Sequence, residues 1–310
     1  MKIFLTGGTG YTGGETIGHL LDAGHEVVAI ARKVPTQAPG RDGLRWVEGD
    51  FANGALIESL AREADGVLHI GASHDADMER LDGIFIRAVG DALAGTGKVF
   101  VSTSATPVYG DTGPDPRDEH EPIENPLPFR EWRMRHDIEV VGFADRGIRS
   151  VIVRPGLIYG RAGGPLSWNI TRARATGKAL YVADGRAASS AVHVDALAKL
   201  YILALENEAA RGIYNAASDE ITLSVDIAET IAAFYGPGIV AESWPLDDAR
   251  KAIGGFADLS NTRCIVSSAR ARRELGWLPV GPTVLSELIG GSYRNGPLAP
   301  YGLEQAKPAQ

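Results

Sequence analysis

Cysteine is nearly absent from this chain of 310 residues, which contains only Cys264. An intrachain disulfide needs two cysteines and a thiolate zinc cluster needs several, so the sequence excludes both. A reactive thiol also needs an activating neighbour, and the sequence displays none around Cys264. We therefore expect Cys264 to be a packed, unreactive side chain.

Long apolar runs are missing as well. No stretch approaches the roughly 20 apolar residues that a membrane-spanning helix requires. The apolar run Ile3-Phe4-Leu5, which follows Met1-Lys2 directly, is too short for the core of a signal peptide. The sequence therefore predicts a cytoplasmic protein with no membrane partner.

Basic charge is not in surplus, because the formal net charge is −8. This balance argues against electrostatic binding of nucleic acid or of an anionic membrane, but it allows an anionic ligand in a local basic pocket. Hydrophobic residues make up 44% and charged residues 23%, which is ordinary for a globular protein. The length fits one large domain or two closely packed ones.

The first half of the chain contains alternating strand-like and helix-like segments. Apolar runs predict strands at residues 2–6, 26–31, 44–47, 65–72, 98–102 and 150–153. Helical spacing of apolar residues predicts helices at residues 11–23, at 78–93 and from 131 onward, and a proline-rich loop at 106–128. This alternation predicts an α/β fold with a Rossmann-type doubly wound parallel sheet.

A glycine-rich segment, Gly7-Gly8-Thr9-Gly10-Tyr11-Thr12-Gly13, lies between the first predicted strand and the first predicted helix. In that position Gly7 allows a tight turn, Gly10 lets the backbone approach a pyrophosphate, and Gly13 lets the helix pack on the strand. The free N–H groups of the helix start, at Tyr11 and Thr12, suit phosphate oxygens. The alternative is a glycine-rich turn without a ligand.

The end of the second predicted strand bears on the choice between NAD and NADP. A carboxylate there would bind the ribose 2′-hydroxyl, but this strand ends in Arg32 and Lys33, which suit a 2′-phosphate. We therefore expect NADP(H), with NAD less favoured; the alternative is two solvated cations. Asp50, followed by Phe51, is expected to accept a hydrogen bond from the adenine amino group, or else to be a turn aspartate.

Together these segments resemble the extended short-chain dehydrogenase/reductase family, in particular sugar-nucleotide epimerases and dehydratases, from Met1 to about Tyr293. The segments that carry the resemblance, besides the glycine loop, are residues 69–73, 101–106, 108–111, 154–160, 193–195 and 267–277. The resemblance implies further cofactor contacts at Gly71, Ala72, Ser73, Ser102, Pro155 and Ile158.

The sequence departs from this family at the expected active site. Family members carry a Tyr-x-x-x-Lys pair on the helix after the proline-rich loop, where the tyrosine acts as acid and base. Here Trp132 falls at the expected tyrosine and His136 at the expected lysine, and no tyrosine lies between Gly110 and Ile158. Indole cannot exchange a proton usefully, whereas imidazole can. Ser104 matches the family's active-site serine, so we expect Ser104 and His136 to be the catalytic residues, with an atypical acid/base.

We expect no metal site. His74, Asp75 and Asp77 superficially offer ligands, but such groups in a polar loop are usually solvated. Four arginines, Arg161, Arg172, Arg174 and Arg186, are candidates for binding a substrate phosphate or for plain surface charge.

After Pro155 the pattern loosens into a smaller mixed α/β region. Helices are expected around residues 166–176, 194–206, 222–235 and 268–275, and strands near 179–182 and 212–216. We expect residues 1–160 to form an NADP-binding Rossmann domain whose sheet also receives segments from about 187–217. Residues 161–186 and 218–295 should form a substrate-binding region, and residues 296–310 a surface tail.

Three functions fit these observations. The first is an NADP(H)-dependent oxidoreductase or epimerase/dehydratase-like enzyme that acts on a small carbonyl or hydroxyl substrate. The second is a non-catalytic regulator that senses NADP(H), and the third is a non-redox lyase or isomerase on the same fold. Trp168, Trp244 and Phe256 are expected to line a substrate pocket. The resemblance also implies a homodimer through residues 76–95 and 131–146, although Arg133 and Arg135 oppose that packing.

Overall fold

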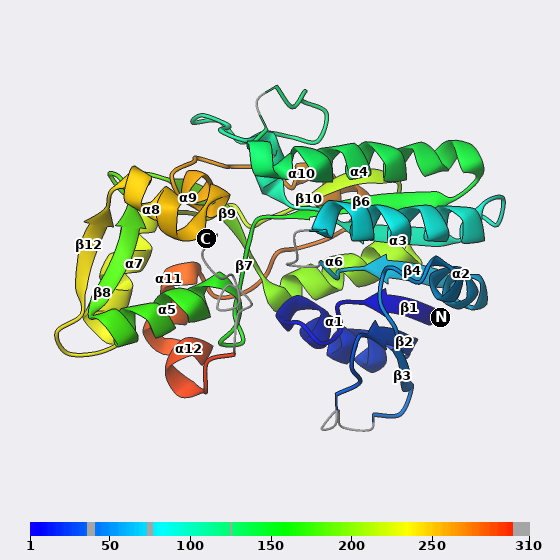
Figure 1. The fold of residues 1–310 in the computed structure, drawn as a ribbon, viewed down its shortest axis with the longest axis horizontal. Coiled ribbons are helices and arrows are strands. Elements are labelled where there is room, and N and C mark those ends of the chain that lie inside the picture. The colour runs from blue at the N-terminus through cyan, green and yellow to red at the C-terminus, as the bar shows by residue number, and fades with distance from the viewer. Residues whose placement is uncertain (36–40, 73–76, 125, 300–310) are drawn as a thin grey trace.

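The computed structural model describes residues 1–35, 41–72, 77–124 and 126–299, which form two lobes (Figure 1). The larger lobe is built on a seven-stranded sheet in the order β10-β6-β5-β4-β1-β2-β3, with every neighbouring pair parallel. Its strands are β1 (Lys2–Thr6), β2 (Glu26–Ala31), β3 (Leu44–Glu48), β4 (Gly66–His69), β5 (Val99–Thr103), β6 (Arg149–Pro155) and β10 (Gly212–Ala216). The predicted α/β class and the Rossmann-type sheet are confirmed.

Helices cover both faces of this sheet, as the continuous apolar strands require. One hydrophobic core lies under α1 (Tyr11–Asp22), α6 (Val194–Glu206) and α10 (Ala269–Leu275). The other core lies under α2 (Gly54–Glu63), α3 (Met78–Leu93) and α4 (Glu131–Gly142), on the opposite side of the sheet in Figure 1. The loop at 106–128 is largely irregular, as predicted, with a short 3-10 helix at Thr106–Tyr109; a second spans Pro128–Arg130.

The strand order fixes the position of the ligand crevice. From β1 the chain moves through β2 to β3 on one side, and then returns to β4, β5 and β6 on the other. In open parallel sheets the ligand crevice lies outside the carboxyl ends of the strands at such a reversal. The ends of β1 and β4 therefore flank the candidate cofactor site.

The smaller lobe, on the left of Figure 1, comes mainly from the second half of the chain. It holds two small sheets, with the strand orders β11-β9-β7 and β12-β8. Their strands are β7 (Leu157–Tyr159), β8 (Lys178–Val182), β9 (Ala188–His193), β11 (Ile221–Leu223) and β12 (Val240–Trp244). Its helices are α5 (Gly164–Thr176), α7 (Ser224–Phe234), α8 (Leu246–Ile253), α9 (Gly255–Ser260), α11 (Val284–Gly290) and α12 (Ser292–Asn295).

Residues 187–217 divide between the lobes. β10 extends the large sheet and α6 packs beneath it, whereas β9 pairs with β7 and β11 in a separate sheet. The expectation that this whole segment joins the main sheet therefore needs correction for β9. The division into a cofactor domain and a substrate region stays a prediction.

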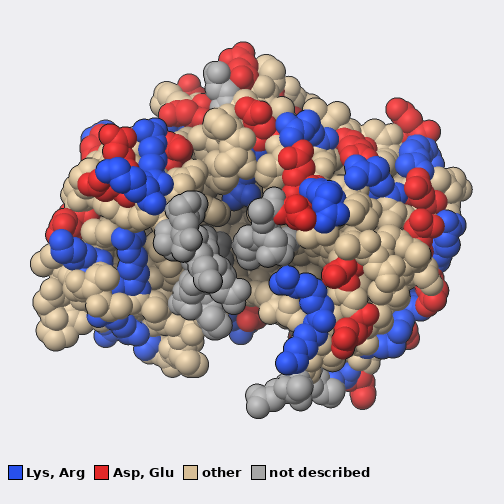
Figure 2. All heavy atoms as spheres, in the orientation of Figure 1, with Lys and Arg blue, Asp and Glu red and all other residues tan. Residues whose placement is uncertain are grey.

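The structure shows how Cys264, the apolar helices and the charged side chains are placed. Cys264 is buried, and burial raises the pKa of its thiol to about 11, which fits a packed side chain. Among the described residues, no helix is both long and apolar enough to cross a membrane. Figure 2 shows Lys and Arg mixed with Asp and Glu on a face that is hollowed between the two lobes.

Candidate cofactor and active site

The glycine loop lies tightly against the loop that follows β4. A Cβ atom on Gly7, whose φ is +78°, would lie 2.6 Å from the backbone nitrogen of Gly71. A Cβ atom on Gly13 would lie 2.2 Å from the carbonyl oxygen of Gly7, to which Gly10 donates its N–H at 2.9 Å. The three glycines therefore form one compact turn, which lies at the reversal of the strand order.

A side-chain hydrogen bond joins the ends of β1 and β4. The Thr6 hydroxyl oxygen accepts the backbone N–H of Gly71 at 3.0 Å and lies 2.7 Å from Nδ1 of His69. Nε2 of His69 lies 2.9 Å from a carboxylate oxygen of Asp82. A carboxylate only accepts, so Nε2 of His69 carries the proton in that bond, leaving Nδ1 to pair with the Thr6 hydroxyl.

Asp82, on α3, is the centre of a buried polar cluster that sequence reasoning missed. Besides His69, it accepts from Nδ1 of His136 at 2.7 Å and pairs with Arg133 at 3.3 Å, both on α4. Burial alone would raise the pKa of Asp82, but Arg133 and the two imidazoles hold it well below its ordinary value. Asp82 is therefore a carboxylate that links α3, α4 and the end of β4.

Ser104 belongs to a second buried cluster. Its hydroxyl donates to Asp137 at 2.8 Å, and Nε of Arg154 donates to the same carboxylate oxygen at 2.9 Å. Arg154 also donates to the hydroxyl of Tyr109, which in turn donates to Asn215 of β10. Burial raises the pKa of Tyr109, so its hydroxyl stays protonated and serves this network. The two expected catalytic residues thus contact different carboxylates, Asp137 for Ser104 and Asp82 for His136.

The buried residues of α4 show which of its faces points inward. They include Arg133, His136 and Asp137, whereas Trp132 is half-buried and lies with its ring centre 4.3 Å from the Arg133 guanidinium. Arg133 and Asp137 are four residues apart and therefore share one helix face. That spacing was visible in the sequence, but only the structure shows that Arg133 and Asp137 are buried and that Trp132 is half-buried.

The remaining expected cofactor residues lie at the strand ends or in the loop after β4. At the strand ends, Ser102 and Pro155 are buried, Ile158 is half-buried in β7, and Arg32 and Lys33 are exposed directly after β2. Ala72 is exposed beside Gly71, while Ser73, His74 and Asp75 lie outside the described residues.

Several of these side chains have structural partners of their own. Tyr11 donates to the carbonyl of Gly160 at 2.8 Å, so it joins the first helix to the loop after β7. Phe51 packs against the ring of His69 at 5.4 Å between centroids. Asp50 accepts the N–H of Ala52, which is the turn geometry named as its alternative. The Thr12 carbonyl accepts the side-chain hydroxyl of Thr16 at 2.7 Å.

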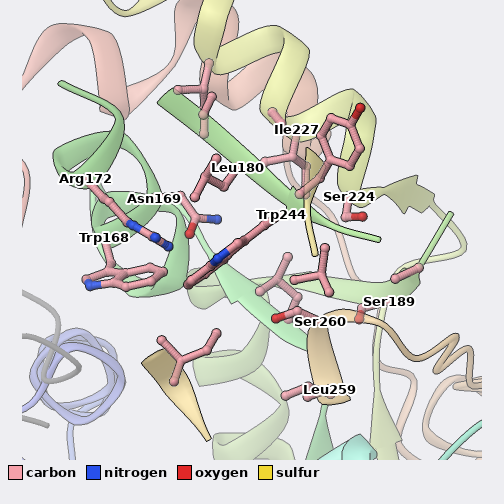
Figure 3. A pocket seen from close by; sticks show the side chains of 18 of the residues that line it. Trp168, Asn169, Arg172, Leu180, Ser189, Ser224, Ile227, Trp244, Leu259 and Ser260 are labelled. Atoms are coloured by element: carbon pink, nitrogen blue, oxygen red, sulfur yellow. The ribbon is translucent and has the colours of Figure 1, made fainter. Parts of the chain in front are cut away.

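A cavity of about 160 Å³ lies in the smaller lobe (Figure 3). Trp168 of α5 and Trp244 of β12 line it, as predicted, together with residues of β8, α7 and α9. Phe256 is not among the lining residues and instead packs on Phe129 at 5.5 Å between ring centroids. Ser104 does not line this cavity. The imidazole of His136 opens to a different hollow, between charged side chains of α3 that include Glu79 and Arg87.

Among the described residues, no three His, Cys, Asp or Glu side chains are grouped so that they could hold a metal ion. Of the four arginines considered for phosphate binding, only Arg172 lines the cavity. Arg161 pairs with Asp195 at 3.0 Å, and Arg174 donates to the carbonyl of Tyr235.

Comparison with known proteins identifies a family and relatives that this chain resembles. The model of the NAD dependent epimerase/dehydratase family matches residues 3–217. An uncharacterized protein of Saccharomyces cerevisiae is 31% identical over 297 residues, covering 90% of this chain and 95% of that protein. UDP-glucose 4-epimerase of Corynebacterium glutamicum is 28% identical over 319 residues, covering 90% of this chain and 91% of the epimerase.

Solved structures show the same fold. dTDP-glucose 4,6-dehydratase from Bacillus anthracis in complex with NAD superimposes with a TM-score of 0.77, at 16% identity and 95% coverage of both chains. UDP-glucose 4-epimerase of Thermus thermophilus in complex with NAD gives a TM-score of 0.76, at 19% identity, covering 95% of this chain and 97% of the other. The resemblance inferred from the sequence motifs is confirmed.

The glycine loop yields a matched pair of variants. We expect Gly13→Ala to weaken NADPH binding by more than about tenfold, ~1.4 kcal/mol, because its Cβ collides with the carbonyl of Gly7. Gly14→Ala is the control, since a Cβ there would lie 3.5 Å from the nearest atom, an ordinary contact. Titration followed by tryptophan emission measures both. Equal binding by the two variants would show that the loop does not hold the cofactor.

Asp82 should carry a large part of the stability of this region. We expect Asp82→Ala to lower the free energy of unfolding by about 3–5 kcal/mol, because it leaves buried Arg133 without its partner. Asp91→Ala on the same helix removes an exposed pair with Arg146 and should cost less than about 1 kcal/mol. Urea unfolding at pH 7 compares the two.

The stabilisation by Asp82 should also depend on pH. Its pKa is lowered on folding, so the contribution is complete above the unfolded value of about 3.9 and is lost as the pH falls below it. The stability gap between the native chain and Asp82→Ala should therefore narrow from pH 7 to pH 3. A gap that stays constant over this range would contradict an ionised Asp82.

Proposed function

Since this chain belongs to the NAD dependent epimerase/dehydratase family, we propose that it is an NADP(H)-dependent oxidoreductase acting on a small carbonyl or hydroxyl compound. The observation that carries the proposal is the compact glycine turn of Gly7, Gly10 and Gly13 at the reversal of the strand order. That arrangement, with the start of α1 behind it, suits a pyrophosphate. The named structural neighbours bind NAD, which supports the same kind of ligand here.

NADP(H) is proposed over NAD(H) because of the residues after β2. Arg32 and Lys33 are exposed at the carboxyl end of this strand, and no carboxylate takes the place of the usual ribose ligand there. A guanidinium matches the geometry of a phosphate, whereas a ribose hydroxyl is better bound by an acid. In this proposal Asp50 and Phe51 flank the adenine, and Gly71, Ala72, Ser73, Ser102, Pro155 and Ile158 follow the cofactor toward its nicotinamide.

The acid/base arrangement is proposed to be atypical. Because Arg133 and Asp137 share the inward face of α4, we assign the family's Tyr-x-x-x-Lys spacing to Phe129 and Arg133, three residues before Trp132 and His136. Phe129 offers no hydroxyl, and Arg133 keeps a cation next to Asp82. This register supports Ser104 as the group that bonds the substrate oxygen, whereas His136 would act only indirectly, by holding Asp82 in place.

The bound cofactor would supply a hydride that reduces a carbonyl carbon, or accept one from a carbinol. The chain has to hold the substrate oxygen and deliver or remove one proton there. Ser104 can donate a hydrogen bond to that oxygen if it leaves Asp137, with the transferred proton drawn from water, and Arg154 would continue to balance the charge of Asp137. General acid catalysis typically accelerates a reaction about 10²–10⁴-fold. Hydride transfer assisted by only a weak acid would therefore still proceed, at a reduced rate.

A second candidate is a regulator that binds NADP(H) without chemistry. The commitment of the Ser104 hydroxyl to Asp137 and the absence of a tyrosine from the sequence between Gly110 and Ile158 favour it. A non-redox lyase or isomerase is the third candidate on this fold.

The proposed location is the cytoplasm, and the proposed assembly is a homodimer through α3 and α4. Arg133 and Arg135 oppose the packing of such a dimer less than the sequence suggested. Arg133 turns inward to Asp82, and Arg135 forms an ion pair with Glu79 of α3.

The deciding experiment is titration with NADPH and, separately, NADH, followed by incubation of the complex with a panel of aldehydes and ketones. Tight NADPH binding with oxidation of NADPH supports the enzyme. Tight binding with no turnover of any carbonyl supports the regulator, and no binding of either nucleotide overturns both.

Arg32→Ala tests the choice of nucleotide. We expect NADPH affinity to fall about 10–100-fold, by the ~1.5–3 kcal/mol of a charged hydrogen bond, while NADH affinity stays unchanged. Arg62→Ala is the control, because Arg62 lies at the amino-terminal edge of the sheet, where its carbonyl accepts from Lys98. Its side chain pairs with Glu58 of α2. A parallel loss for both nucleotides would disprove the 2′-phosphate assignment.

Ser104→Ala tests the proposed active site. We expect kcat to fall about 10²-fold while the Kd for NADPH is unchanged, because in this proposal the hydroxyl bonds the substrate oxygen or Asp137 but not the nucleotide. Ser150→Ala is the control, since that hydroxyl, on β6, donates to the carbonyl of Val141 on α4. His136→Gln, measured alongside, shows whether the imidazole affects the same step. An unchanged kcat in Ser104→Ala would remove Ser104 from the mechanism.

A further inference from the structure

The cavity of the smaller lobe has an unusual charge distribution. Its lining includes the cations Arg172 and Lys178, and the lining residues that the structure describes contain no aspartate or glutamate. Lys178 forms an ion pair with Glu242 at 2.7 Å, so its charge is balanced within the protein. The uncompensated charge at this cavity therefore comes from Arg172.

Arg172 is held by aromatic rings and not by an acid. Its guanidinium carbon lies 4.0 Å from the ring centre of Trp244 and 5.3 Å from that of Trp168. Within the described part of the chain its side chain makes no hydrogen bond or ion pair, although it is half-buried. A guanidinium that lies over an indole face is held there by a cation–π contact, which leaves its N–H donors for a ligand.

The neighbours of Arg172 complete a site with one polar end and one apolar end. Figure 3 shows Asn169 beside Arg172 and the two indoles, and the Asn169 amide makes no hydrogen bond to any described residue. Leu157, Ile227 and Leu259 form apolar wall around the rest of the cavity. A ligand must therefore combine an anionic group with an apolar body.

The size of the cavity limits that body. Its volume is about 160 Å³, and a protein cavity of roughly 150 Å³ accommodates benzene. Pockets for drug-sized ligands are typically about 300–1,000 Å³, so a nucleotide sugar is too large for the cavity as it stands. Strand β7 lies between the cavity and the proposed nicotinamide position, because Leu157 lines the cavity and Ile158, on the opposite face of the strand, is a proposed neighbour of the nicotinamide.

We propose that this cavity binds a small carboxylic acid with a single aromatic or branched aliphatic body, whose carboxylate pairs with Arg172 and Asn169. The carboxylate would be the anionic end of the substrate. That the bound acid is a substrate rests on the proposed function, whereas its binding in the cavity does not. A planar carboxylate accepts two parallel N–H bonds from a guanidinium, which a neutral alcohol cannot do.

Benzoate is the probe, and calorimetric titration of the full chain without nucleotide is the measurement. We expect benzoate to bind, benzyl alcohol to bind at least about tenfold more weakly, and UDP-glucose not to displace benzoate. Arg172→Gln should weaken benzoate binding by at least about tenfold. Arg186→Gln, an exposed arginine of the same lobe that does not line the cavity, should bind like the native chain.

Each contrary result overturns a defined part of the proposal. Equal binding of benzoate to the native chain and to Arg172→Gln removes the anion site, and displacement of benzoate by UDP-glucose removes the size limit. Tighter binding of phenyl phosphate than of benzoate replaces the carboxylate by a phosphate. NADPH titration of the same samples separates the two proposals, because the native chain can fail to bind benzoate while still binding NADPH, or the reverse.

Discussion

The carboxylate of Asp82 receives hydrogen bonds from His69 at the end of β4 and from His136 on α4, and it balances the charge of Arg133. Through His69 the same contacts reach Thr6, whose hydroxyl holds the N–H of Gly71 against the glycine loop. One buried charge thus sets the relative position of two helices, two strand ends and the candidate pyrophosphate turn. Because an unpaired buried charge is costly, these parts are stable only together.

The strands and helices of the larger lobe could be predicted from the sequence because short, continuous segments specify them. An apolar run such as Lys2–Thr6, followed by closely spaced glycines and a helical pattern, specifies strand, turn and helix within about twenty residues. The helix at Gly54–Glu63 was overlooked although Leu56, Ile57 and Leu60 have helical spacing, so that omission was avoidable. The smaller lobe has short strands that pair only with distant segments, as β8 does with β12, and such pairing leaves a weak local pattern.

The candidate site was harder to predict because its contacts are not local. Asp82 and His136 are 54 residues apart, and neither has a sequence feature that indicates its partner. Similarly, Trp132 and Arg133 are adjacent in the chain, and only the packing of α4 decides which one faces inward. The expected role of Phe256 met the same difficulty, because its partner Phe129 precedes it by more than a hundred residues. Sequence motifs therefore located the site, but its individual contacts depended on tertiary packing.

The contact between Phe129 and Phe256 has a kinetic consequence. Phe129 precedes α4 in the larger lobe and Phe256 belongs to α9 of the smaller one, with Gly255 so close to Phe129 that a Cβ would lie 2.8 Å from its ring. The pair contributes about 0.5–1.5 kcal/mol beyond its buried area, and the Arg130 guanidinium lies 4.7 Å from the centre of the Phe129 ring and 5.6 Å from that of Phe256. A movement that parted the lobes at this point would break this contact, so the ring at the proposed tyrosine position would slow that opening and would not move a proton.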